Sequence, residues 1–130
     1  MKIATLALAG LALMTAVPAL AHHSFAMFDR QKLLTTTGTV REFEWTNPHV
    51  WIHVMVPDNA GKQVEWSFEM QAISTNAALG WRPDSVRPGD KVTIEFYPLK
   101  DGSRGGQLAA AVLADGKRLG GPVRRPNAQE

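Results

Sequence analysis

The histidines are the residues of this sequence best suited to bind a metal ion, and the four of them are His22, His23, His49 and His53. If the chain is cut before His22, that residue offers an α-amine and a ring nitrogen together. The amine has a reference pKa of about 7.7–8.0, so a metal ion can displace its proton near neutral pH. An amine combined with imidazoles is a nitrogen donor set that suits Cu(II). The pattern predicts a copper site formed by His22, His23 and His49.

His49 and His53 are expected on one face of a single strand, about 13 Å apart by strand rise, so one ion cannot bind both without distortion. His49 is the better candidate, because it lies at a loop edge. In the alternative interpretation, His22 and His23 belong to a frayed terminus. His49 then bonds a backbone carbonyl beside the Asn47-Pro48 turn, and His53 is an ordinary surface residue of a strand.

Cleavage before His22 is predicted from the composition of segment 1–21. Lys2 precedes an apolar run from Ile3 to Val17, and Ala19-Leu20-Ala21 places small residues before the cut, a pattern typical of a secretory signal. The run is short for a membrane span, which needs about 20 residues; an uncleaved anchor is the alternative. We expect a mature chain of 130 − 21 = 109 residues that is periplasmic or secreted and has no membrane span.

Charge and cysteine content argue against several functions. The chain has 14 Lys and Arg against 12 Asp and Glu, a formal charge of +2, and loss of Lys2 leaves +1. Because a nucleic-acid-binding protein needs a basic footprint, we expect no nucleic-acid partner. The absence of cysteine excludes disulfides, thiolate metal sites and cysteine nucleophiles. The sequence also lacks a nucleophile elbow, a His-Glu-x-x-His motif and a phosphate loop, so we expect no enzyme.

Alternating apolar residues and turn signals predict the elements that position these side chains. The expected strands are 35–45, 49–56, 64–70, 91–99 and 107–114, with one short helix at 71–80. This order is that of the OB-fold, a small five-stranded Greek-key β-barrel, so we expect a mainly β protein of this type. Another small barrel or sandwich is the alternative. We assign 22–34 to an N-terminal arm, 35–119 to the barrel and 120–130 to a disordered tail.

The second and third strands are each predicted to bury one face. The expected core sets are Val50, Ile52, Val54 and Val56 on one strand and Val64, Trp66, Phe68 and Met70 on the other. Both sets face the core if Val54 lies opposite Trp66, and a slip of one residue would turn one set outward. In this register, His53 lies opposite Ser67 on the outer face, Met55 opposite Glu65, and Trp51 opposite Glu69.

This outer face is a usual ligand platform of OB-folds. We predict a ligand site formed by Asn47, Trp51, Glu69 and Trp81. Because Glu65 and Glu69 would repel a phosphate backbone, the face favours a cation, a sugar or a protein partner. Alternatively, its polar residues are simply solvated and Trp51 is covered by the arm.

Several stretches resemble a known family. AHHSFAMFD, GTVREFEWTNPHVWIHV, EWSFE, LGW, RPGDKVTIEFYPLKDG and DGKRL resemble the domain of unknown function 6152 family of exported bacterial proteins. The resemblance covers His22 to about Leu119, and its most specific part runs from Trp45 to His49. It implies a small periplasmic β-barrel and no assigned activity. His53 and Met55 differ from the family's usual pattern, which favours the other three histidines as ligands.

Two functions follow from these patterns. The leading hypothesis is an exported, non-catalytic module that binds a small molecule or a metal ion, copper being the candidate, near the arm, the 47–49 turn and Trp51. The alternative is a structural or protein-interaction module of the envelope that uses the Trp51 face. The alternative predicts a contiguous apolar patch around Trp51 and Trp81. A hydrolase or redox enzyme is a third class.

Overall fold

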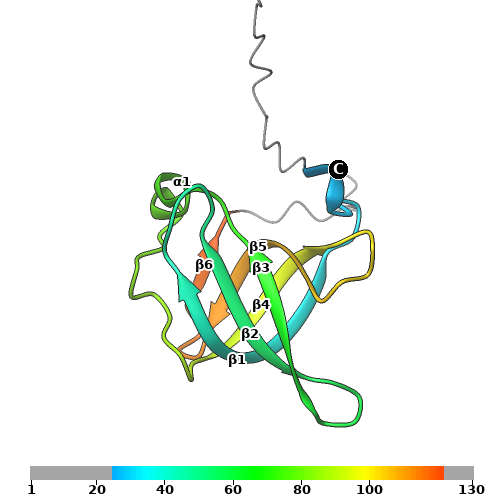
Figure 1. Ribbon diagram of the computed structural model, residues 1–130. Coiled ribbons are helices and arrows are strands. Elements are labelled where there is room, and N and C mark those ends of the chain that lie inside the picture. The colour runs from blue at the N-terminus through cyan, green and yellow to red at the C-terminus, as the bar shows by residue number, and fades with distance from the viewer. Residues whose placement is uncertain (1–24, 122–130) are drawn as a thin grey trace, which may run out of the picture.

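The computed structural model describes residues 25–121, in which strands dominate (Figure 1). In chain order the elements are η1 (Phe25–Met27), β1 (Leu34–Glu44), β2 (Trp51–Pro57), β3 (Gln63–Glu69), α1 (Ile73–Ala78), β4 (Lys91–Pro98), β5 (Gly105–Leu113) and β6 (Arg118–Gly120). The predicted order of three strands, one helix and two strands is confirmed. The short strand β6 was not predicted, and it extends the barrel domain to Gly120.

Strand pairing closes the sheet into a five-stranded barrel. The strands follow the order β3-β2-β1-β4-β5-β6, and a parallel pairing between β3 and the start of β5 joins the two sides. β1 pairs with β4 through its first half and with β2 through its second half. A register shift between Val40 and Glu42 bends β1 where it passes from one partner to the other. The architecture is the OB-like barrel that the sequence predicts.

The core lies inside this barrel, with the predicted register. Val54 pairs with Trp66 and Ile52 with Phe68. Ile52, Val54 and Phe68 are fully buried, and the Phe68 ring centroid lies 4.9 Å from that of Phe96 on β4. The alternation of apolar residues on β2 and β3 therefore fixes which side of the hairpin is left for a ligand.

Trp81 is a core residue, which corrects its prediction as a ligand contact. Its side chain is 0% exposed, and its ring centroid lies 5.8 Å from that of Phe43. The backbone N–H of Trp81 donates to the Asn76 carbonyl at 3.0 Å, which ties the residue to the helix just before it. Helix α1 lies at one end of the barrel (Figure 1), and the Trp81 indole that follows it belongs to the buried core cluster.

The arm is folded onto the barrel from Met27 onward. The N–H of Lys100 donates to the Met27 carbonyl at 2.9 Å, and the N–H of Asp29 donates to the Pro98 carbonyl at 2.8 Å. Phe28 is buried and bridges to Leu99. The arm is thus held by the hairpin between β4 and β5, and it ends where β1 begins at Leu34.

Other predictions concern residues outside 25–121. The predicted signal segment 1–21, His22, His23 and the tail from 122 lie outside the described residues. Between residues 25 and 121, no helix has the length and apolar character needed to cross a membrane.

Candidate functional site

The outward side chains of β1, β2 and β3 form one continuous polar surface, which we call the β1–β3 face. Its members are Arg41, Glu42, Glu44, Trp51, His53, Met55, Glu65, Ser67 and Glu69. The pairing sets them in rows that cross the strands. One row is Glu44, Trp51 and Glu69, and the next is Glu42, His53 and Ser67. The cross-strand neighbours predicted for β2 and β3 are confirmed.

The β1–β3 face is acidic although the whole chain carries a formal charge of +2. Its four glutamates against one arginine give 1 − 4 = −3 with the histidines neutral. Arg41 is engaged by two of the glutamates: its Nε lies 2.5 Å from Glu65 Oε2, and its Nη2 lies 3.2 Å from Glu42 Oε2. The negative charge of Glu44 and Glu69 therefore dominates the row that contains Trp51.

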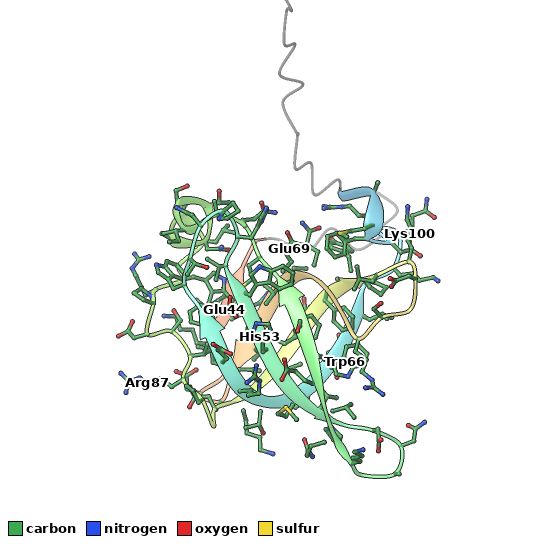
Figure 2. The ribbon with its side chains drawn as sticks, viewed as in Figure 1. Glu44, His53, Trp66, Glu69, Arg87 and Lys100 are labelled. Atoms are coloured by element: carbon green, nitrogen blue, oxygen red, sulfur yellow. The ribbon has the colours of Figure 1, made fainter. Side chains whose placement is uncertain are left out.

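His53 lies at the centre of the β1–β3 face and is largely buried. Its Nε2 lies 3.1 Å from Glu44 Oε1, and its Nδ1 lies 2.8 Å from Ser67 Oγ and 3.6 Å from Glu65 Oε1. The ring also stacks on Trp51 at 8° between planes and 6.3 Å between centroids. Figure 2 shows Glu44 beside His53, with Glu69 nearer the α1 end of the same side. Both ring nitrogens of His53 are thus occupied within the face.

His49 lies at the β2 end of this surface and is partly buried. Its Nδ1 lies 3.0 Å from the Met70 carbonyl oxygen and 3.4 Å from Glu69 Oε1. Because a carbonyl only accepts hydrogen bonds, Nδ1 of a neutral ring carries the hydrogen, and the lone pair lies on Nε2. A metal ion would therefore bind His49 through Nε2. The predicted carbonyl bond is present, with Met70 as the acceptor.

Glu69 is buried at 5% exposure, although the sequence places it among outward residues. The reason is that β5 runs beside β3 at this point, where Glu69 pairs with Gln107. Arg30 of the arm donates to Gln107 Oε1 at 2.6 Å and stacks over the Tyr97 ring at 4.8 Å. The arm is thereby anchored beside the end of the face that holds His49.

The remaining predicted ligand residues have different environments. Trp51 is partly buried on the β1–β3 face, as predicted. Asn47 is exposed, but its Oδ1 accepts the Ile73 N–H at 3.0 Å and so supports the first residue of α1. Because Trp81 lies in the core, the apolar patch of Trp51 and Trp81 that the envelope-interaction hypothesis predicts is not formed.

Metal binding by described residues alone is not supported. Within residues 25–121, no group of three or more His, Asp or Glu side chains is arranged to hold one metal ion. Glu44 and Glu65 approach opposite nitrogens of His53, so these three groups do not converge on one point. A copper site at His49 would need the donors predicted at His22 and His23, which lie outside the described residues.

Sequence reasoning missed the role of Glu44. The register of β2 and β3 places Ser67 opposite His53, but Glu44, which contacts the other nitrogen of the His53 ring, lies on β1. The bulge between Val40 and Glu42 sets which β1 side chain reaches the His53 ring. No periodicity in the sequence marks that shift.

The comparisons with known proteins include a solved structure of similar fold. A search among curated proteins found no match. A mitochondrial single-stranded DNA binding protein of S. cerevisiae is similar in structure, with 14% sequence identity, a TM-score of 0.49, and coverage of 69% of this chain and 96% of that chain. At this level, the likeness carries no argument about what this chain binds.

The same finding corrects one expectation. Near-neutral charge led us to exclude a nucleic-acid partner, and this exclusion is contradicted, because a protein of similar fold is a single-stranded DNA binding protein; the likeness does not assign such a partner to this chain. We therefore withdraw the exclusion.

The family comparison covers most of the chain. A model of a family of unknown function, DUF6152, matches residues 11–109, and the stretches that carry the resemblance from His22 onward fall largely within this range. The chain belongs to the DUF6152 family.

Proposed function

We propose that this protein is an exported binding module, periplasmic or secreted, that holds a small organic cation on the β1–β3 face. The observation that carries the proposal is the row in which Trp51 lies between Glu44 and Glu69. Carboxylates on both sides of an indole favour a positive charge near the ring. The expectation that the protein is not an enzyme stays a prediction.

The geometry of Trp51 supports an amine ligand. An ammonium group near an indole face gains about 0.5–1 kcal/mol at an exposed site and about 2 or more when desolvated. His53 stacks on one side of the indole, so the other side is turned away from His53. A ligand there would place an ammonium group near the exposed carboxylate of Glu44, while the buried carboxylate of Glu69 adds negative charge from the other side of the row.

Calorimetric titration with spermidine at low ionic strength tests this function. We expect binding that weakens as salt is added, because the attraction between exposed charges is screened. Glu44→Gln is expected to weaken binding about two- to fivefold, the range of one exposed ion pair. Trp51→Leu is expected to weaken it by a similar or larger factor, because the cation–π contact is lost.

The matched control is Glu95→Gln, which removes the same charge from β4, where Glu95 pairs with Arg118 at 3.0 Å. It should leave spermidine affinity nearly unchanged. Equal weakening by Glu95→Gln and Glu44→Gln would indicate a nonspecific charge effect and contradict the site. Tighter binding of a single-stranded oligonucleotide to the same face would contradict the ligand class.

A second candidate function, copper binding, is favoured by the anchoring of the arm. Arg30 bonds Gln107, Gln107 pairs with Glu69, and Glu69 contacts His49. The proposed donors are His22, His23 and Nε2 of His49.

Native mass spectrometry of protein beginning at His22, with sub-stoichiometric Cu(II), tests the copper candidate. We expect one retained ion, and at least tenfold weaker retention in His49→Ala, because one of few nitrogen donors is lost. His53→Ala is the control, since both ring nitrogens of His53 are engaged by other side chains. No retained copper, or equal loss in both variants, would contradict a site at His49.

A further inference from the structure

Three strands bring together a hydroxyl, an imidazole and a carboxylate on the β1–β3 face. Ser67 Oγ on β3 lies 2.8 Å from His53 Nδ1 on β2, and His53 Nε2 lies 3.1 Å from Glu44 Oε1 on β1. Serine is activated in covalent catalysis by this kind of arrangement. The nucleophile is hydrogen-bonded to a base, and a third group orients the base. Binding of a cation by Glu44 and Trp51 makes no use of the Ser67 hydroxyl.

We propose that Ser67 is an activated nucleophile that accepts an acyl group from an ester, with His53 as its general base and Glu44 as a positioning residue. This activity goes beyond the binding role and does not depend on it, and its demonstration would overturn the expectation that the protein is not an enzyme. The motif searches of the sequence could not detect it, because the three residues come from separate strands and the β1 register includes a bulge.

The hydrogen-bond partners fix the orientation of the His53 ring. An ionised carboxylate only accepts hydrogen bonds, so Glu44 selects the tautomer with hydrogen on Nε2. The lone pair of the neutral ring then lies on Nδ1, where the Ser67 hydroxyl donates to it. The nearly parallel stack of His53 on Trp51 further restricts rotation of the ring.

The surroundings of His53 also suit the charged form that the reaction would create. When Nδ1 takes a proton, the imidazolium lies between Glu44 at Nε2 and Glu65, whose Oε1 is 3.6 Å from Nδ1. Arg41 holds Glu65 in place through Nε. Two carboxylates would therefore stabilise the positive charge as it develops.

Strand β5 lies directly beside Ser67 on the side away from β2. In the parallel pairing of β3 with β5, the residue opposite Ser67 is Gly105, which has no side chain. Gly105 is itself buried against the Ser67 backbone, so an acyl donor would approach the partly exposed Ser67 from the outer surface of the face.

The proposed step conserves atoms and charge. The Oγ–H proton of Ser67 moves to His53 Nδ1 as Oγ bonds the ester carbonyl carbon. The bond from that carbon to the leaving alcohol oxygen then breaks, and the proton on Nδ1 passes to that oxygen if it needs one. Water, activated by the same nitrogen, can later hydrolyse the Ser67 ester.

Acetylation of the full chain by p-nitrophenyl acetate tests the proposal. Intact mass and peptide mapping are expected to show one acetyl group on Ser67 at early times. Ser67→Ala should abolish that adduct, whereas Ser103→Ala, a control in an exposed loop, should leave it unchanged. His53→Gln is expected to slow Ser67 acetylation about 100-fold or more, the lower range for loss of a general base.

Glu44→Gln tests whether Glu44 positions the His53 ring for the reaction or only supports the fold. It should lower the rate of Ser67 acetylation and change the midpoint of its pH profile, and Glu44→Asp should restore part of the rate. Thermal melts will confirm that each variant is folded, and Ser67→Cys provides a second nucleophile at the same position that should also be acetylated. Adducts found only on lysines, or Ser67 acetylation that is equally fast in folded His53→Gln, would overturn the proposal.

Discussion

Replacing Trp81 by alanine is expected to lower the free energy of unfolding by about 3–5 kcal/mol, the usual cost of removing a large buried aromatic ring. The side chain is 0% exposed and packs near Phe43 in the main core cluster. A cavity at the α1 end of the barrel would remain, because the strands around it are held by their hydrogen-bonded pairing. Urea denaturation followed by circular dichroism measures the loss.

Two further substitutions test whether the loss of stability comes from the buried position and the ring volume of Trp81. Trp51→Ala should cost less than Trp81→Ala, because Trp51 is partly buried on the outer face. Trp81→Phe should cost less than Trp81→Ala, because part of the ring volume is kept. Within the described residues, Nε1 of Trp81 has no hydrogen-bond partner. Replacing the indole by a phenyl ring therefore removes no hydrogen bond. Equal costs for Trp51→Ala and Trp81→Ala would contradict the placement of Trp81.

Gly105→Ala is expected to destabilise the protein by about 3 kcal/mol or more, because it adds a steric clash to backbone strain. Gly105 has φ of +145°, and a Cβ atom there would lie 2.0 Å from the Ser67 carbonyl oxygen. This residue begins the parallel pairing of β5 with β3 that closes the barrel. The two strands would have to separate, so amide hydrogen exchange should rise first at 67–69 and 105–107.

Gly116→Ala is the matched control for this change. Gly116 has φ of +86°, but no atom lies within 4 Å of the position that a Cβ would take. It should cost only about 1–2 kcal/mol, the penalty for a left-handed conformation without a clash. If the two alanine variants lose the same stability, the close approach of β3 and β5 would be contradicted.

The barrel could be predicted because its strands alternate cleanly. On β2 and β3, apolar residues at every second position leave one register that buries both sets, and that register is observed. The outer face follows directly, since His53, Ser67 and Trp51 must then point away from the core. The cross-strand contact between His53 and Ser67 could thus be read from two segments alone.

Other features depend on partners that no local pattern reveals. Glu69 belongs to the outward set of β3, yet it is buried because β5 pairs beside it. Trp81 follows a short helix and could point either way; packing at the barrel end turns it inward. Contact between Glu44 and His53 depends on the β1 bulge. The arm is attached by contacts with distant segments, among them the hydrogen bond between Arg30 and Gln107 across 77 residues.

A spermidine titration of isotope-labelled protein, followed by amide chemical shifts, tests the ligand face most directly. We predict that the largest shifts lie in β1, β2 and β3 at residues 44, 51, 53, 67 and 69, and that Glu44→Gln reduces them. The largest shifts in the β4–β5 hairpin or β6 instead, with the β1–β3 residues unmoved, would contradict the ligand face.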